Sequence, residues 1–367
     1  MQPVLMILLQ NNGRTKIDSV IINSSIDNIL QSPIIYKIMI DTLGSIGGNQ
    51  ATVNLMNYTF GAIDSVEFKA WLTLPNGQLN DENSFNDTLF KVIRPALSGT
   101  YFLDAKGQAS ADTFTTFSDF SNMINKWGMC GNVTLEVVKG SGPYNESVHF
   151  QSIFHGPNDT LRIIGNGEIL NYNGPLYNWN VAFSVSNCSN FILDDLAVTI
   201  DGLKGIGISL NNVENVIVSN CKVFFKHKTD DYQYIGIGIG SLMYYRSFST
   251  ANGVKILNNQ IVDGYSSIVV STLNGGDIKN VLIKGNKIED FGFEGINLWG
   301  GDSIRIVGNE FTRLNRINYD GYKGILVGSS SNLLIEKNLF HNIVSPGSFF
   351  RTFSAIECNN SPNVGKT

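Results

Sequence analysis

The second half of the chain repeats one pattern of apolar and polar positions. Each copy holds two pairs of positions, with the members of a pair two residues apart and a step of three residues from the first pair to the second. The copies read NFILDDLAV, NVIVSNCKV, GVKILNNQI, NVLIKGNKI, SIRIVGNEF and NLLIEKNLF, and they begin at Asn190, Asn215, Gly253, Asn280, Ser303 and Asn332. A seventh copy begins at Asn363. Copies recur about every 23 to 38 residues, which is typical of a solenoid whose units bury their apolar faces against one another.

Alignment of the copies places their side chains in columns. Alternation with period two predicts a strand with one buried face, as for Val281 and Ile283. The three-residue step from Ile283 to Asn286 predicts a bend with Asn286 at its corner, and Ile288 then points inward again. Asn tolerates left-handed backbone and bonds to turn groups. Stacked Asn side chains can also bond one another from coil to coil. The corner column is Leu196, Cys221, Asn259, Asn286, Asn309 and Asn338.

A second apolar strand follows each copy, so that a unit holds two or three short strands. These second strands read GIGISL, IGIGIG, SIVVST, GINLWG, GILVGS and AIECNN. The units lack the helix of a leucine-rich repeat and are too short for a propeller blade. The pattern therefore predicts a parallel β-helix, and the handedness of parallel crossovers predicts that it is right-handed.

The composition of the chain limits which classes of partner it can bind. The net charge of −5 and the pI near 5.4 argue against nucleic acid and anionic membrane as partners. No apolar run is long enough for a transmembrane helix. The opening MQPVLMILL lacks a basic start and a cleavage site, so we expect a strand there and a sequence that is a fragment at both ends. Cys188 and Cys221 lie about one coil apart in different columns, and their disulfide status stays open.

The first 97 residues lack the repeat and alternate like the strands of a small sandwich. The stretches LQNNGRTKIDSVIINSSI, VNLMNYTFGAIDSVEFKAWLTLPNG and NDENSFNDT resemble the immunoglobulin-like (CARDB-like) modules of large secreted proteins from Bacteroidetes-type bacteria. The matching features are Lys69–Trp71, Pro75–Gly77 and the pair Asn86–Asp87. The resemblance implies a spacer or adhesive module at 1–97 and places the β-helix at 98–367, cut off in mid-repeat.

The start of the second domain carries one amphipathic helix. Phe117, Phe120, Ile124 and Trp127 recur at helical spacing, Thr116 or Ser118 can cap the start, and Gly128 can end it. A solenoid exposes its core at its ends, so the segment 116–128 is expected to cap the β-helix. Gly99–Tyr101, Thr116–Asp119 and Gly128–Val137 resemble the entry into β-helix domains of the same secreted proteins, in the pectate-lyase-like superfamily.

Candidates for catalysis are sparse. Glycoside hydrolysis needs two carboxylates on one face, and a lyase needs a base and usually Ca²⁺. Asp230 and Asp231 lie in the longest insertion, Asp263 and Asp290 occupy equivalent positions after successive strands, and Glu294 precedes a second strand. We do not find metal-ligand spacing, so no metal is expected, and Ca²⁺ enters only if the protein is a lyase.

Candidates for ligand binding are the aromatic residues outside the repeated core and one charged position. Tyr244, Tyr245 and Trp299 can stack on sugar rings, and Arg313 continues the row of Asp263 and Asp290. The sequence favours an extended, carbohydrate-binding or adhesive rod, extracellular or on a cell surface, whose partners are a polysaccharide or surface glycan and further domains of a longer chain. The alternatives are a polysaccharide lyase or glycoside hydrolase of the pectate-lyase-like fold, and a structural spacer. Whether the protein is an enzyme stays open, with a non-catalytic role preferred.

Overall fold

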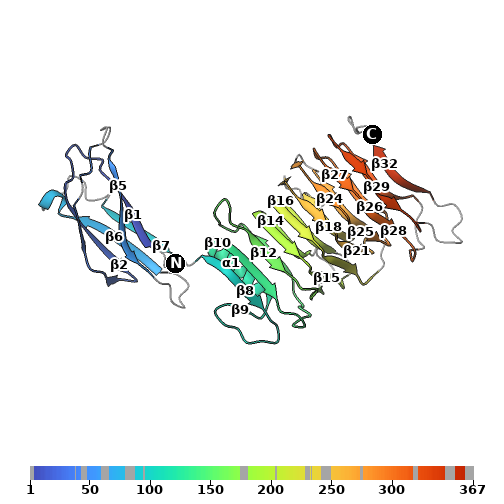
Figure 1. The fold of residues 1–367 in the computed structure, drawn as a ribbon, viewed down its shortest axis with the longest axis horizontal. Coiled ribbons are helices and arrows are strands. Elements are labelled where there is room, and N and C mark those ends of the chain that lie inside the picture. The colour runs from blue at the N-terminus through green and yellow to red at the C-terminus, as the bar shows by residue number, and fades with distance from the viewer. Residues whose placement is uncertain are drawn as a thin grey trace. The chain divides into compact units, whose positions relative to one another are not determined.

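The computed structural model shows an all-β protein whose coils form a right-handed parallel β-helix (Figure 1). It describes residues 4–37, 39–42, 48–58, 66–78, 87–93, 96–173, 181–202, 205–227, 232, 234–240, 249–272, 276–316, 321–343 and 352–359. By the density of internal contacts, the chain divides into two compact units, Met1–Pro95 and Ala96–Thr367. Each unit has its own hydrophobic core.

The first unit consists of antiparallel sheets. Among its described residues, β1 (Val4–Gln10) pairs with β5 (Gln50–Asn57), while β2 (Val20–Ile26) pairs with β6 (Val66–Thr73). Two shorter strands, β3 (Ile29–Leu30) and β4 (Ile34–Tyr36), also pair with β2, and β7 (Thr88–Ile93) pairs with β6. Alternate residues of β6, including Val66 and Phe68, are buried, as period-two patterning predicts.

In the second unit, each regular coil runs through two parallel sheets. The first half of each repeated phrase forms a strand of the larger sheet. The chain then bends at the corner column, and the second half of the phrase forms a strand of the smaller sheet. The second strand then returns to the larger sheet. In one coil these three segments are β24 (Leu282–Lys284), β25 (Lys287–Glu289) and β26 (Glu294–Trp299).

Parallel strands from successive coils form both sheets. The smaller sheet contains β13 (Ile169–Tyr172), β15 (Ala197–Ile200), β17 (Lys222–Phe225), β21 (Gln260–Val262), β25, β28 (Glu310–Thr312) and β31 (Leu339–Phe340). The larger sheet begins with β8 (Leu97–Leu103), β9 (Thr113–Phe114), β10 (Met129–Val137), β11 (Val148–Gln151), β12 (Leu161–Ile164), β14 (Val181–Asp194) and β16 (Gly205–Ser219). It continues through β18 (Tyr234–Gly240), β19 (Thr250–Asn252), β20 (Lys255–Leu257), β22 (Ser266–Ser271), β23 (Asp277–Lys279), β24, β26, β27 (Arg305–Val307), β29 (Tyr322–Gly328), β30 (Leu334–Glu336) and β32 (Phe353–Asn359).

The corner Asn residues form a continuous hydrogen-bonded ladder, as the stacking prediction requires. The Nδ2 atoms of Asn259, Asn286 and Asn309 donate to the Oδ1 atom of the next Asn at 3.0, 2.9 and 2.9 Å, and the ladder ends on Asn338. Each Oδ1 also accepts the backbone N–H of the preceding Asn. Three of the four residues are at most 1% exposed. Buried amides are stable here because every coil supplies the partner of the next.

The left-handed residue at this corner is not the ladder Asn but the residue before it. Asn258, Gly285, Gly308 and Lys337 have φ values of 55°, 68°, 62° and 56°. The prediction that the ladder Asn itself adopts left-handed backbone was therefore wrong by one position. The physical reason is that two neighbouring residues have different roles. The first adopts left-handed backbone and turns the chain, and the second, the ladder Asn, forms the hydrogen bonds between coils.

A column of small residues lets the two sheets approach closely. In each second strand, a small residue follows the first outward residue. This position holds Gly207, Gly236, Ser267, Gly295 and Gly324 in successive coils. A Cβ atom at Gly324 would come within 2.2 Å of Phe340 Cε1 and 2.6 Å of the Ala355 carbonyl oxygen. The repeated Gly of GIGISL, GINLWG and GILVGS is thus a packing requirement.

The helix α1 (Phe117–Trp127) forms where the sequence predicts it. The Thr116 side chain accepts from the Asp119 N–H at 3.0 Å, and Gly128, with φ 72°, ends the helix. Phe117, Phe120 and Ile124 are buried in the core of the first coils. The Glu146 carboxylate accepts from the N–H groups of Phe117 and Ser118, both at 2.8 Å, which satisfies the free donors of the first turn.

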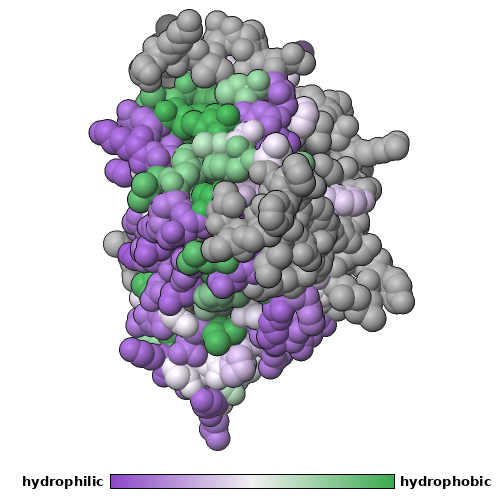
Figure 2. Space-filling model, turned by 90° about the vertical axis from the view of Figure 1, so that its right-hand side faces the viewer, coloured by the Kyte–Doolittle hydropathy of each residue, from purple (hydrophilic) through white to green (hydrophobic). Residues whose placement is uncertain are grey.

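Toward the last described coil the core is less covered. Ile335, Phe340 and Phe353 are partly buried, and Leu339 and Ile356 are exposed. Figure 2 views the molecule from this side and shows hydrophobic residues as patches between hydrophilic ones.

Candidate functional site

The second strands of the larger sheet carry polar residues on their outer face. In β26 the inward Ile296 and Leu298 are fully buried, and Asn297 and Trp299 alternate with them on the outer side. Glu294 begins the same strand and pairs in register with Ser266 of β22 and Lys323 of β29. The alternation that builds the core brings Asn297 and Trp299 to the outer surface. Glu294, three residues before Asn297, lines one cavity together with both of them.

Trp299 stands between two cavities in the described part of the chain. The larger cavity has a volume of about 440 Å³ and is lined by Thr272, Gly276, Asp277, Ile278, Trp299, Gly300, Gly301, Asp302, Ser329 and Ser331. The smaller cavity is lined by Tyr232, Ile235, Tyr265, Ser266, Val269, Ser271, Glu294, Asn297 and Trp299. The Trp299 side chain is 39% exposed, and its ring lies against Gly328 of the next coil.

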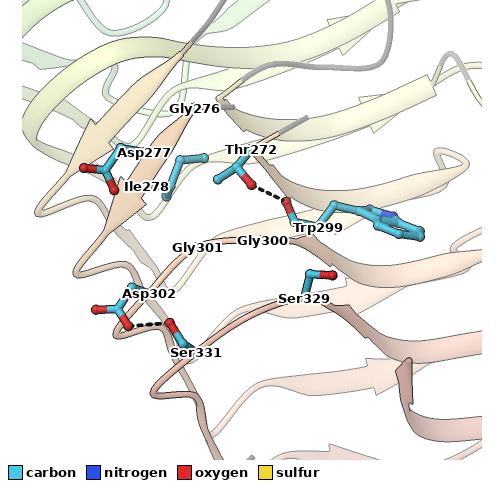
Figure 3. A pocket seen from close by; sticks show the side chains of 10 residues that line it. All are labelled: Thr272, Gly276, Asp277, Ile278, Trp299, Gly300, Gly301, Asp302, Ser329 and Ser331. Atoms are coloured by element: carbon cyan, nitrogen blue, oxygen red, sulfur yellow. Dashed lines mark hydrogen bonds between the residues drawn. The ribbon is translucent and has the colours of Figure 1, made fainter. Parts of the chain in front are cut away.

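Small residues form the floor of the larger cavity. Gly300 and Gly301 have φ values of 88° and 102°, and a Cβ atom at Gly300 would come within 1.8 Å of Thr272 Oγ1. Only glycine fits this turn without strain. Figure 3 shows the Trp299 indole on one side of the cavity and the side chains of Asp277 and Asp302 on the other.

The two carboxylates of the larger cavity are held in different ways. Asp302 accepts from Ser331 Oγ at 2.5 Å, Asn332 Nδ2 at 2.8 Å and Ser303 Oγ at 2.9 Å, and these bonds lower its pKa. Asp277 pairs with Lys279 at 2.7 Å, which raises the pKa of Lys279. The lowered pKa keeps Asp302 ionised at neutral pH, and no basic side chain of the described residues lines this cavity.

The smaller cavity holds a buried acid. Glu294 is 4% exposed, and its Oε2 accepts from Ser266 Oγ at 2.6 Å. Burial raises the pKa of the Glu294 carboxyl to about 7, although the bond from Ser266, the charge of Lys323 and a bond from Asn297 lower it. Lys323 Nζ itself lies 4.4 Å from the centre of the Phe293 ring and 3.8 Å from Glu357 Oε1.

The predicted row of Asp263, Asp290 and Arg313 forms, but its side chains interact with other groups of the protein. The row stacks in register, since the N–H groups of Asp263 and Asp290 donate to the next coil at 3.0 and 2.9 Å. Asp290 accepts from the Asn315 N–H and from Asn315 Nδ2 at 2.8 and 2.9 Å. Arg316 Nη1 lies 3.8 Å from Asp263 Oδ1.

Arg313, 1% exposed, turns inward from the same row. It donates to the carbonyl oxygens of Phe291, Arg316 and Gly292 at 2.9, 3.1 and 3.4 Å and lies 4.0 Å from the Tyr322 ring centre. Neither Arg313 nor the two aspartates lines either cavity.

Of the sequence candidates, the structure brings Glu294 and Trp299 together in one cavity and places Asp263, Asp290 and Arg313 elsewhere. Asp230, Asp231, Tyr244 and Tyr245 lie outside the described residues. Sequence reasoning missed Asn297 and Asp277. The outward register of Asn297 between Ile296 and Leu298 was a signal that could have found it.

Several other expectations concern metals, cysteines and membranes. The described residues contain no group of three or more His, Cys, Asp or Glu side chains placed to hold a metal ion. All four cysteines are free thiols, so Cys188 and Cys221 are not joined. No helix within the described ranges is both long and apolar enough to span a membrane.

Comparison with known proteins agrees with the fold. Residues 244–365 match the family described as a right-handed β-helix region. A GH136 lacto-N-biosidase from Eubacterium ramulus has 11% identity and a TM-score of 0.44, covering 66% of this chain and 56% of that one. A family 28 exopolygalacturonase from Yersinia enterocolitica has 10% identity and a TM-score of 0.25, covering 99% of each chain.

A surface adhesin is among the similar structures. PfbA, a surface adhesin of Streptococcus pneumoniae, has 12% identity and a TM-score of 0.18, covering 64% of this chain and 88% of that one. The match to the lacto-N-biosidase covers 56% of that chain, so this chain spans just over half of its length. No curated protein matches the sequence. The β-helix family match describes the fold and does not identify a ligand or an activity.

Proposed function

We propose that the protein binds carbohydrate on the outer face of its β-helix, in the surface centred on Trp299. The observation that carries this proposal is the exposed indole between two cavities, because ligand pockets combine aromatic side chains with a few polar groups. An indole offers a flat apolar surface to a sugar ring, and the hydroxyls of Thr272, Ser329 and Ser331 offer hydrogen bonds beside it.

The surrounding structure suits recognition of a chain rather than of a single sugar. The larger cavity draws its lining from three successive coils, the segments 272–278, 299–302 and 329–331. Strands of neighbouring coils lie about 4.8 Å apart. A site that crosses three coils therefore runs along the β-helix, in the direction that a bound polysaccharide would take. A structural spacer would need neither the exposed indole nor the cavity.

The proposal includes the setting of the molecule. The protein acts outside the cell or on its surface, as part of a longer bacterial chain in which residues 1–97 form an immunoglobulin-like spacer and the segment 116–128 caps the β-helix. The resemblance of these segments to secreted bacterial modules supports this setting. The protein then works as an adhesive or carbohydrate-binding rod.

Affinity electrophoresis over neutral, acidic and amino-bearing polysaccharides tests the proposal. At least one polysaccharide should retard the protein, and Trp299→Ala should abolish the retardation. Phe154→Ala is the matched control, because Phe154 is an aromatic residue of the same unit that is 80% exposed and lines neither cavity. Retardation that survives Trp299→Ala would show that the protein binds elsewhere.

Glycoside hydrolysis is the second candidate, and Glu294 favours it. A buried carboxyl with a pKa of about 7 can donate a proton at neutral pH, as the acid of a glycosidase must. A second carboxylate is needed, and Glu357, whose Oε1 lies 3.8 Å from Lys323 Nζ, is a candidate. Release of reducing ends that is lost in Glu294→Gln would establish this activity, whereas Ca²⁺-dependent release of unsaturated products would indicate a lyase.

A further inference from the structure

The smaller cavity beside Trp299 contains an acceptor that the protein does not satisfy. Asn297 is 5% exposed, and its Oδ1 atom is a buried acceptor with no hydrogen-bond partner among the described residues. A buried polar atom without a partner costs stability and is uncommon in native proteins. Asn297 lines the cavity, so this acceptor lies beside the space that a ligand group would enter.

A carboxyl group stands beside this acceptor. Glu294 begins the strand that carries Asn297 and lines the same cavity. Its carboxylate accepts bonds from Ser266 Oγ and from the Asn297 side chain, and a carboxylate offers about four acceptor positions. The cavity therefore presents acceptors from two side chains at the same place, and no lysine or arginine among the described residues lines it.

The size of the cavity limits what can enter. Its free volume is about 20 Å³, which is enough for one small polar group and too little for a sugar ring. The lining includes three aromatic residues, Trp299, Tyr232 and Tyr265. Aromatic walls stabilise a cation that is brought against their faces. A small cationic donor meets all three conditions, because it donates several hydrogen bonds, neutralises the carboxylate and contacts the rings.

The charged groups around Glu294 leave its carboxylate available to a ligand. Lys323 approaches from the next coil, but its Nζ lies over the Phe293 ring and pairs with Glu357. Asp277 and Asp302, across Trp299, add negative charge to the adjoining cavity, and Lys279 offsets one of them. The surface as a whole therefore attracts cations and repels uronates and sulfates.

We propose that this cavity seats the ammonium group of an amino sugar, with Glu294 and Asn297 as its acceptors and the sugar ring stacked on Trp299. The inference rests on the proposed carbohydrate binding and names its ligand class, a polysaccharide with free amino groups. An N-acetylated sugar is too bulky for the cavity, and a neutral hydroxyl does not use the carboxylate charge.

Calorimetric titration at pH 7 with three tetrasaccharides that share one backbone tests the proposal. The β-1,4-linked tetramers of glucosamine, N-acetylglucosamine and glucose differ only in the group at the second carbon. The glucosamine tetramer should bind at least tenfold more tightly than the other two. Glu294→Gln should remove this preference, because the amide keeps the shape of the side chain and loses its charge.

Asn297→Leu serves as the second variant, because it removes the acceptor at nearly constant volume, and it should weaken glucosamine binding at least fivefold. Glu310→Gln is the control, since Glu310 lies on the smaller sheet, pairs with His341 and should leave binding unchanged. Equal affinity for the glucosamine and glucose tetramers, a preference retained in Glu294→Gln, or absence of glucosamine binding would each overturn the proposal. Binding of the glucose tetramer that is lost in Trp299→Ala would still support the proposed carbohydrate function, so the two failures are distinguishable.

Discussion

The Asn286 side chain donates to Asn309 Oδ1 at 2.9 Å while its own Oδ1 accepts from the side chain and the backbone of Asn259. Replacement of Asn286 by Leu removes these bonds and leaves buried donors and acceptors in three coils without partners. The free energy of unfolding should fall by about 3 kcal/mol. Urea unfolding followed by circular dichroism measures the loss.

The exposed Asn pair on the same solenoid provides the control for this prediction. Asn280 Nδ2 donates to Asn252 Oδ1 at 2.8 Å in an exposed position. Asn252→Ala should cost less than about 1 kcal/mol, because water replaces the lost bond. Equal losses in the two variants would mean that the buried ladder contributes nothing beyond an ordinary surface hydrogen bond.

The close approach of the sheets at Gly324 gives a second prediction. Gly324→Ala places a Cβ atom 2.2 Å from Phe340 Cε1 and 2.6 Å from a backbone oxygen, so the coil must shift. We expect a loss of about 2 kcal/mol. Ser267→Ala in the same column should change stability by less than about 0.5 kcal/mol, since that coil already holds a Cβ atom. An unchanged melting midpoint for Gly324→Ala would show that the sheets can separate without cost.

Titration of Glu294 should make the stability of the protein depend on pH. The folded pKa of about 7 lies above the ordinary value of 4.5, so the folded state binds the proton more tightly than the unfolded state. The resulting stability is present below pH 4.5 and is lost as the pH rises through 7, by about 3 kcal/mol in total. Glu294→Gln should therefore match the wild type at pH 4.5 and exceed its stability at pH 8.

Unfolding curves at both pH values measure this difference. Glu214→Gln, an exposed position on β16, should leave the pH profile of stability unchanged. Parallel profiles for the wild type and Glu294→Gln would show that this carboxyl titrates as it does in water.

The buried Arg313 should be among the most sensitive positions of the β-helix. Arg313→Met leaves three carbonyl oxygens without their donor and removes the cation from the Tyr322 ring. A loss of about 3 kcal/mol is expected. Arg305→Met, on the exposed face of β27, should cost less than about 0.5 kcal/mol. A comparable loss at the two positions would contradict the bonding described for Arg313.

Much of the β-helix was predictable because its columns repeat. Val281, Ile283 and Ile288 are buried as their period requires, and the stacking of Asn259 on Asn286 followed from their shared column. The left-handed residue was placed one position too late, because Asn258 and Asn259 are both Asn and the sequence does not say which one turns. Only the coil-to-coil bonds separate their roles.

The site was less predictable, because its environment comes from residues outside the phrase. In the sequence, Asp290 was a candidate for catalysis. In the structure, Asn315, from a segment that does not repeat, donates hydrogen bonds to both of its carboxylate oxygens. Glu294 was one candidate among five, and its raised pKa depends on burial that no local pattern reveals. The cavity beside Trp299 needs three coils in register, and spacings that vary between copies do not fix that register.

The most direct test of the proposed function is the affinity of the wild type, Trp299→Ala and Phe154→Ala for whichever polysaccharide retards the protein most strongly, measured by calorimetry. We predict that Trp299→Ala weakens binding at least thirtyfold while Phe154→Ala leaves it unchanged, because only Trp299 stands between the two cavities. Unchanged affinity in Trp299→Ala, or an equal loss in both variants, would contradict the assignment of carbohydrate binding to this surface.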